Sequence, residues 1–183
     1  EIEIVPAGKP RDFGIDRSMV MAYGQDDKVC AYTSFEAMLK VNKPEYTCGT
    51  ILVDKEEIGS VGATGMSSMF FENTVAEIIN LCGDYSELKL RRALANSRML
   101  SSDVSVAFDP NYPLVTESRN TAYFGRGIVF NKYTGSKGKA GCNDANPEFI
   151  AKLRSIMDGN NVSWQTSELG KVDMGGGGTI AYI

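Results

Sequence analysis

The sequence predicts an α/β fold in which a sheet is packed between helices. Three observations support this prediction. Short runs of β-branched and apolar residues alternate along the chain with segments whose apolar residues recur at helical spacing. Several helical segments begin or end with residues typical of helix caps. Acidic residues stand at the ends of these elements, and open α/β sheets collect functional groups at the carboxyl ends of their strands.

The first part of the chain predicts two strands and one helix. Residues 1–5 (EIEIV) alternate charged and apolar side chains, as a half-buried strand does. From Asp26 to Lys40 the apolar residues recur at helical spacing, and Asp26 or Asp27 is available as the N-cap. The β-branched run 50–53 predicts a buried strand.

Two further helices are expected after a glycine-rich loop. The segment 69–82 places its apolar residues on one helical face, and Gly83 suits the position that follows the last turn. The segment 86–95 begins with Ser86 as the N-cap, and its basic residues form a solvated face. Both helices would therefore present one side to the sheet and the other to solvent.

The last part of the chain alternates in the same way. Strand-like runs lie around 99–106, at 127–132 and at 162–164. Between the last two, Asn146 as N-cap and Pro147 at the first helical position predict the start of a helix that Gly159 ends.

Composition excludes several kinds of site. The 183 residues contain no histidine, so Ser-His-Asp or Cys-His catalysis and histidine-containing zinc fingers are excluded within them. The net charge of −4 argues against a nucleic-acid binder, which usually presents a basic face. No apolar run approaches the roughly 18 residues of a membrane span. The four cysteines form no CxxC pair and are expected to be reduced, mostly buried thiols of a cytoplasmic protein.

Three acidic clusters could meet at one edge of the sheet. They are Asp26-Asp27, Glu56-Glu57 and Asp103. Convergent carboxylates repel one another unless a cation lies between them or some are protonated. Two adjacent glutamates point in different directions, so one could bind a metal while the other moves the proton of a metal-bound water. The alternative is that the glutamates are solvated surface acids and that the aspartates cap a helix.

Glycines and cysteines offer weaker signals. The segment 173–178 (DMGGGG) could cradle a phosphate, but it matches neither GxxxxGK[ST] nor GxGxxG. Its glycines also suit a tight turn or a backbone that another group approaches closely. Cys30 and Cys82 lie within apolar helical patterns, so we expect both to be core residues rather than nucleophiles.

Five segments of the chain resemble, in the same order, motifs of the aspartyl aminopeptidase / vacuolar aminopeptidase I family of zinc metallo-aminopeptidases, in its bacterial branch. They are GIDRSMVMAYGQDDKVCAYTS (14–34), DKEEIGSVGATGM (54–66), SSDVSVAFDPNYP (101–113), KYTGSKGKAGCNDA (132–145) and WQTSELGKVDMGGGGTIA (164–181). The resemblance runs nearly from end to end. It implies a three-layer α/β/α sandwich with a mixed, mostly parallel sheet, as in zinc-dependent exopeptidases.

The resemblance also implies a role for each acidic cluster. Asp26 would bridge two metal ions, Glu57 would ligate one of them and Asp103 the other. Glu56 would be the general base that activates the metal-bound water. The peptide bond between Asp26 and Asp27 would be cis. The segment that would form part of the substrate pocket contains Asp173, Gly176 and Gly177.

The family's site needs two histidines that this chain lacks, one upstream before an inserted dimerisation domain and one downstream. We therefore expect residues 1–183 to be the central segment of the catalytic domain, without the upstream part, the inserted domain and the C-terminal end. The expected cofactors are two divalent metal ions, zinc first, with cobalt or manganese as alternatives. The expected partners are peptides with a free N-terminus and, for the full-length protein, further copies of itself in a homo-oligomer. No nucleic acid or membrane is expected.

The expected function is that of a two-metal aminopeptidase, with the segment alone inactive because it lacks both histidines. The alternative is a non-catalytic peptidase-like scaffold or interaction module, which the missing histidines would also fit. A third interpretation is a phosphohydrolase that uses the same carboxylates with a hard metal ion. Histidines in the flanking sequence would separate the first hypothesis from the second.

Overall fold

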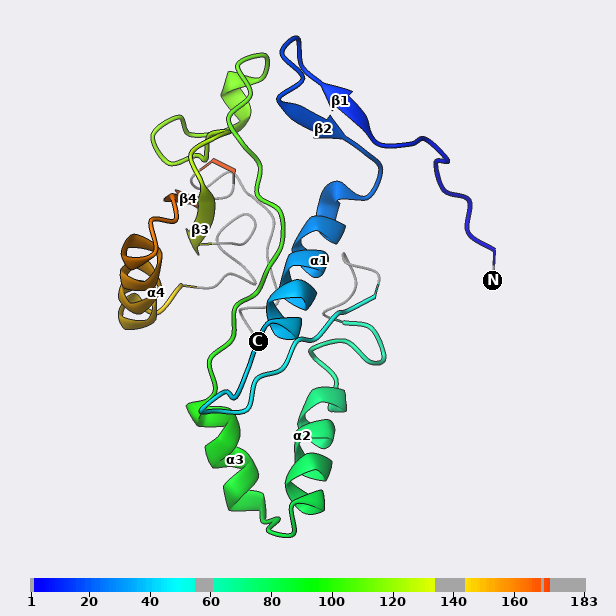
Figure 1. The fold of residues 1–183 in the computed structure, drawn as a ribbon, viewed down its shortest axis with the longest axis vertical. Helices are drawn as coiled ribbons and strands as arrows, with labels where there is room; N and C mark the ends of the chain where they lie inside the picture. Colours follow the sequence, from blue (N-terminus) through cyan, green and yellow to red (C-terminus); the bar gives the residue numbers. More distant parts are fainter. Residues whose placement is uncertain (1, 55–60, 134–143, 169, 172–183) are drawn as a thin grey trace. The chain divides into compact units, whose positions relative to one another are not determined.

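The computed structural model describes residues 2–54, 61–133, 144–168 and 170–171. The chain divides into two compact units. The first unit contains Glu1–Glu56 together with Ser102–Val104, and the second contains Glu57–Ser101 and Ser105–Ile183. Figure 1 shows the helices and strands in chain order. Both types of element are present, as an α/β fold requires.

The first unit opens with a hairpin that the sequence analysis did not predict. Strands β1 (Arg11–Phe13) and β2 (Met19–Met21) pair antiparallel, with Phe13 opposite Met19. The turn between them is closed by a hydrogen bond from the Arg17 N–H to the Gly14 carbonyl at 3.1 Å. Gly14 has φ +91°, which glycine adopts without steric cost. The hairpin therefore depends on turn chemistry at Gly14 rather than on a long alternating pattern.

Helix α1 (Gln25–Leu39) confirms the first predicted helix, although neither aspartate caps it. Gly24 stands at the N-cap in the left-handed region with φ +76°, and its carbonyl accepts a hydrogen bond from the Lys28 N–H at 3.2 Å. Asp26 and Asp27 have non-helical backbone angles, so regular helical geometry begins after them. The entrance of the helix is thus a distorted turn that carries both acidic side chains.

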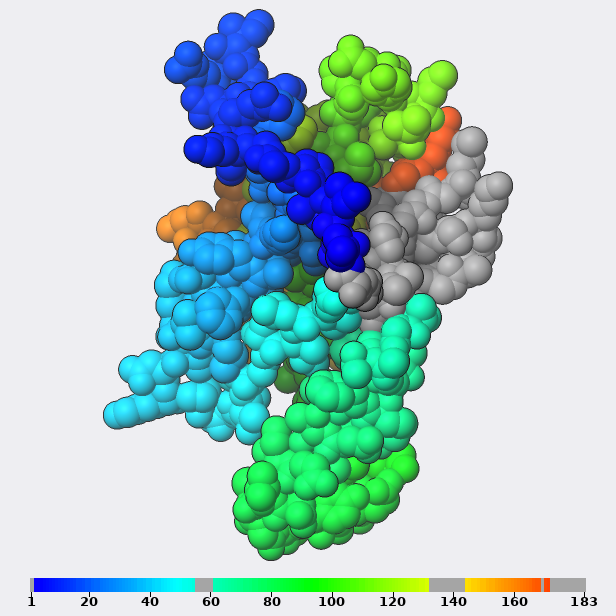
Figure 2. Space-filling view, turned by 90° about the vertical axis from the view of Figure 1, so that its right-hand side faces the viewer, coloured from blue at the N-terminus to red at the C-terminus, as the bar shows by residue number. Residues whose placement is uncertain are grey.

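Helices α2 (Phe70–Leu81) and α3 (Glu87–Asn96) of the second unit confirm both predictions for this region. Gly83 follows α2 with φ +80°, and the Ser86 hydroxyl accepts a hydrogen bond from the Lys89 N–H at 3.3 Å. Figure 1 shows the two helices side by side, and they form one continuous green body in Figure 2. Leu90 of α3 is 3% exposed. Local capping thus determines where both helices begin and end.

A parallel strand pair forms the other part of the second unit. Strand β3 (Ile128–Tyr133) pairs with β4 (Trp164–Glu168), and helix α4 (Pro147–Gly159) connects them. The Asn146 side chain accepts a hydrogen bond from the Phe149 N–H at 2.9 Å, which confirms the predicted cap. The last strand begins at Trp164 rather than at residue 162.

The segment around Asn120 and Ala122 lies beside the end of β4. The Glu168 N–H donates to the Asn120 carbonyl at 2.7 Å, and the Phe108 N–H donates to the Ala122 carbonyl at 2.8 Å. Ala107 and Ala122 form an isolated parallel bridge. In the described residues the buried apolar side chains are Leu90, Ala122 and Leu153. All three belong to the second unit, so its helices and sheet supply the buried apolar contacts.

Three predicted strands are wrong for the described residues. Residues 2–5, 50–53 and 99–106 form no strand there. A strand is defined by hydrogen bonds to a neighbouring strand, and the described part of the chain supplies no such neighbour for these segments. The apolar residues of these segments suit a strand, but such a pattern does not determine which other segment would pair with that strand.

Side-chain exposure also corrects the expectation for the cysteines. Cys30, Cys48 and Cys82 are free thiols, as expected, whereas Cys142 lies outside the described residues. Cys48 and Cys82 are exposed rather than buried, and Cys30 is half-buried. No described side chain of the first unit is buried. None of the described helices is long and apolar enough to cross a membrane.

The close approach of Gly127 to the chain before β4 gives a test of the parallel pair. Gly127 has φ +94°, and a Cβ atom added there would collide with the backbone of Ser163. The Ser163 carbonyl also accepts the N–H of Ile128 at 3.0 Å. We expect Gly127→Ala to lower the free energy of unfolding by about 3 kcal/mol, through steric overlap and backbone strain.

Chemical unfolding followed by circular dichroism would measure this loss. Gly159→Ala is the matched control, because a Cβ at Gly159, the last residue of α4, meets no atom within 4 Å. Equal stability of the two variants would contradict the requirement for glycine at position 127.

Candidate functional site

Two of the predicted acidic clusters come together in the first unit. Partial desolvation of the exposed Asp26 carboxylate raises its pKa above the ordinary value, and the negative charges of Asp103 and Asp27 raise this pKa further. Charges act on one another in this way only when they lie close together. Asp26, Asp27 and Asp103 therefore form one group, which we call the aspartate cluster.

The entrance of α1 positions the first two members of the cluster. The peptide bond between Asp26 and Asp27 is cis, as the sequence comparison with metallo-aminopeptidases implied. Asp26 has φ −86° and ψ 115°, outside the helical region. The Gln25 side-chain amide donates to the Val20 carbonyl at 3.2 Å and so joins the start of α1 to β2. Asp26 is exposed, whereas Asp27 is half-buried.

Asp103 reaches the cluster from a distant part of the sequence. It lies in the short segment Ser102–Val104, which belongs to the first unit although the residues on both sides belong to the second. The Val104 N–H donates to the Asp103 carboxylate at 2.7 Å. This bond restricts the orientation of the Asp103 side chain.

Cys30 lies beside the aspartate cluster rather than in a hydrophobic core. Burial raises the pKa of the Cys30 thiol, and a hydrogen bond with the Ser102 hydroxyl lowers it. The charges of the three aspartates raise this pKa again. The thiol is therefore neutral at physiological pH. The expectation of a core position for Cys30 is therefore wrong, and its spacing from Asp26 gave no signal, because regular helical geometry begins only after Asp27.

The aspartate pair fits part of a divalent cation site. Carboxylate oxygens are ligands for zinc and for harder cations, and a cation between Asp26 and Asp103 would relieve the repulsion that raises the pKa of Asp26. Within the described residues, no three cysteine, aspartate or glutamate side chains gather closely enough to hold a metal ion by themselves. A complete site in this position needs further ligands.

The remaining predicted site residues cannot be placed relative to this pair. Glu56 and Glu57, predicted as base and metal ligand, lie outside the described residues. The same holds for the predicted substrate-binding residues Asp173, Gly176 and Gly177. Their roles stay predictions.

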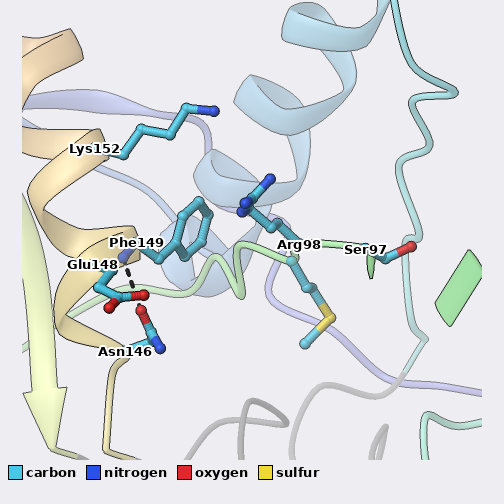
Figure 3. A pocket seen from close by; sticks show the side chains of 7 residues that line it. Ser97, Arg98, Asn146, Glu148, Phe149 and Lys152 are labelled. Carbon is cyan, nitrogen blue, oxygen red and sulfur yellow. Dashed lines mark hydrogen bonds between the residues drawn. The ribbon is translucent and has the colours of Figure 1, made fainter. Parts of the chain in front are cut away.

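The second unit contains a hollow of about 420 Å³, and no residue of the aspartate cluster lines it. Figure 3 shows Arg98 and Lys152 near the ring of Phe149, with Asn146 and Glu148 at the start of α4. The side-chain amide oxygen of Asn146 already accepts the hydrogen bond of the Phe149 N–H. None of the predicted catalytic or metal-binding residues lines this hollow. It therefore offers no site for the expected chemistry.

Comparisons with known proteins identify relatives along the whole chain. The family model of the aminopeptidase I zinc metalloproteases (M18) matches residues 1–183. A probable M18 family aminopeptidase 1 from Clostridium acetobutylicum is 75% identical over 183 residues, which are 100% of this chain and 39% of that protein. A protein of the same description from Thermotoga maritima is 47% identical over 182 residues, which are 99% of this chain and 40% of that protein. The chain thus spans about two fifths of the length of these relatives.

Solved structures agree with the sequence comparisons. The crystal structure of aminopeptidase I from Clostridium acetobutylicum matches with a TM-score of 0.86 and 71% identity, over 97% of this chain and 38% of that one. The M18 aminopeptidase from Thermotoga maritima matches with a TM-score of 0.89 and 44% identity, over 97% of this chain and 39% of that one. The family model covers every residue, and it names the zinc-dependent class that the resemblance implied. This chain belongs to the M18 family of aminopeptidase I zinc metalloproteases.

Proposed function

We propose that this chain is the central segment of the catalytic domain of a two-metal aminopeptidase, which removes N-terminal residues from peptides. The observation that carries the proposal is that desolvation and then the negative charge of Asp103 raise the pKa of Asp26, in a chain of a zinc metalloprotease family. The remaining part of the protein would complete a three-layer sandwich with a mostly parallel sheet. The whole protein would be a cytoplasmic homo-oligomer.

The proposed metal site uses carboxylates from three places in the sequence. Asp26 would bridge two divalent ions, Glu57 would ligate one and Asp103 the other. Three carboxylates alone make an all-oxygen site, which favours hard cations over zinc. Histidines from flanking segments would supply the nitrogen ligands that shift the preference to zinc.

The protein's own residues would divide the proton transfers and the binding of substrate. Two divalent ions, when bound, would polarise the scissile carbonyl and lower the pKa of the attacking water. Glu56 would accept the proton of that water and return a proton to the leaving amine. The backbone at Gly176 and Gly177 would allow the peptide a close approach, with Asp173 beside it.

One observation favours a second candidate, a peptidase-like scaffold without catalysis. The chain contains no histidine, so its carboxylates alone cannot form the nitrogen-containing site of a zinc enzyme. Relatives named as aminopeptidases favour the enzyme over the scaffold. The behaviour of the chain with and without its flanking segments distinguishes the two candidates.

The first prediction concerns the 183-residue chain alone. After treatment with a chelator and reloading with zinc, it should bind zinc weakly and release no N-terminal residue from peptides. Adding the flanking segments of the same protein should restore hydrolysis, because those segments would carry the missing ligands. Hydrolysis by the chain alone would contradict the proposed division of ligands, and failure of a histidine-containing whole protein to hydrolyse peptides would favour the scaffold.

The second prediction concerns charge at Asp26. Its raised pKa means that folding disfavours the charged carboxylate, so the metal-free protein loses stability as the pH rises through this pKa. At neutral pH, metal-free Asp26→Asn should therefore melt at a higher temperature than the metal-free wild type. The difference in melting temperature should shrink as the pH falls below the ordinary pKa of aspartate, because residue 26 is then neutral in the wild type and in the variant alike.

The same variant should lose zinc. We expect the zinc affinity of Asp26→Asn to fall by more than about a hundredfold, which is the largest loss usual for a residue that only supports a metal ligand. Thermal melts with and without zinc measure both effects. Asp12→Asn in β1 is the control, and it should keep the stabilisation that zinc provides. Equal stabilisation of Asp26→Asn and the wild type by zinc would contradict the role of Asp26.

The third prediction separates the base from the ligands. In the whole protein, Glu56→Gln should keep its zinc content and lose turnover by about a hundredfold to ten-thousandfold, the usual contribution of a general base. Metal analysis and peptide hydrolysis on the same preparation provide the comparison. Near-normal turnover would exclude Glu56 as the base, whereas loss of zinc would make it a ligand instead.

A further inference from the structure

We propose that the hollow of the second unit binds the α-carboxylate end of an amino acid or a peptide through Arg98 and Lys152. The hollow has a volume of about 420 Å³, which lies in the usual range for a small-molecule site. All the residues that line it belong to the second unit. The site therefore goes beyond the proposed function and uses no residue of the aspartate cluster.

Two unpaired cationic side chains line the hollow. Arg98 lies two residues after the end of α3, and Lys152 lies on α4. Lys152 stands four residues after Glu148, a spacing at which opposite charges on a helix often pair. Among the described residues, however, neither Lys152 nor Arg98 forms an ion pair. An anion between the two cations would supply the opposite charge that both lack.

The charges around the hollow favour a ligand with a single negative charge. Arg98 and Lys152 contribute two positive charges and Glu148 one negative charge, which leaves a net charge of +1. Figure 3 shows the charged ends of Arg98 and Lys152 on one side of the Phe149 ring and the Glu148 carboxylate on the other side. A monocarboxylate balances this net charge, whereas a phosphate dianion exceeds it. The planar guanidinium of Arg98 also matches the two oxygens of a carboxylate.

Apolar surface beside the cations suits the rest of the ligand. The half-buried Phe149 and the 48% exposed Met99 both line the hollow. An aliphatic side chain placed against them would remove apolar surface from water. The Phe149 N–H is already bonded to the Asn146 side chain, so the cationic side chains rather than the helix end supply the attraction. A residue with a free α-carboxylate and an apolar side chain has both features that the hollow selects.

Isothermal titration calorimetry on the whole protein tests the site, with a chelator present so that the proposed metal site takes no part. N-acetyl-leucine has the carboxylate and a blocked amine, free leucine adds the amine, and N-acetyl-leucinamide lacks the negative charge. We expect the amide to bind at least about tenfold more weakly than N-acetyl-leucine, because it loses the charge-assisted hydrogen bonds. Tighter binding of N-acetyl-leucine than of leucine would identify a peptide end as the ligand, and the reverse would identify a free amino acid. Either order supports the site.

Matched variants assign the binding to the hollow. Arg98→Gln and Lys152→Gln should each weaken the binding of N-acetyl-leucine about tenfold. Glu148→Gln should tighten it, because the variant removes the negative charge of the hollow. All three side chains are exposed, so their replacement leaves no cavity. Arg92→Gln, which changes an exposed residue of α3 outside the hollow, should bind as the wild type does.

Several results would overturn the proposal. Equal binding of N-acetyl-leucine and its amide would reject the role of the carboxylate, as would failure of both acids to bind. Wild-type affinity in Arg98→Gln and Lys152→Gln would place the binding elsewhere. An equal loss in Arg92→Gln would reduce the effect to the net charge of the protein. Inorganic phosphate that binds as tightly as N-acetyl-leucine would reject the selection of a monocarboxylate. All these results leave the proposed function of the aspartate cluster unchanged.

Discussion

Repulsion between two carboxylates is the constraint on which the first unit depends. Asp26 and Asp103 approach one another in a unit without a single buried described side chain. Hydrophobic burial therefore contributes little to holding them together, although it is the usual source of stability in a domain. A cation between them would change an unfavourable contact into a favourable one.

Local chemistry explains which elements the sequence could predict. Ser86 and Asn146 cap their helices through their own side chains, so α3 and α4 begin where the sequence indicated. The predicted strands at 50–53 and 99–106 are wrong because strand pairing depends on a partner segment that no local sequence pattern identifies. The β1–β2 hairpin was not predicted, because its strands are too short to show an alternating pattern.

The candidate site was predictable only in part. Acidic residues at the ends of elements marked Asp26 and Asp103, and the structure brings these two together. The positions of Glu56 and Glu57 lie outside the described residues, so the resemblance alone still carries their roles. The sequence predicts Cys30 as a core residue, because an apolar helical stripe has the same pattern whether it faces a hydrophobic interior or a polar cluster. The effect of the three aspartate charges on the pKa of the Cys30 thiol separates the two cases.

The return of Ser102–Val104 to the first unit has a consequence for biosynthesis. A ribosome adds about 5–20 residues per second, and domains generally fold as units. The hairpin and α1 leave the ribosome well before Asp103 does, so in the interval Asp26 lacks the charge of Asp103 beside it. In the proposed metal site, early capture of an ion by Asp26 would therefore be disfavoured. The order of synthesis would delay the pairing of Asp26 with Asp103 until both parts of the chain exist.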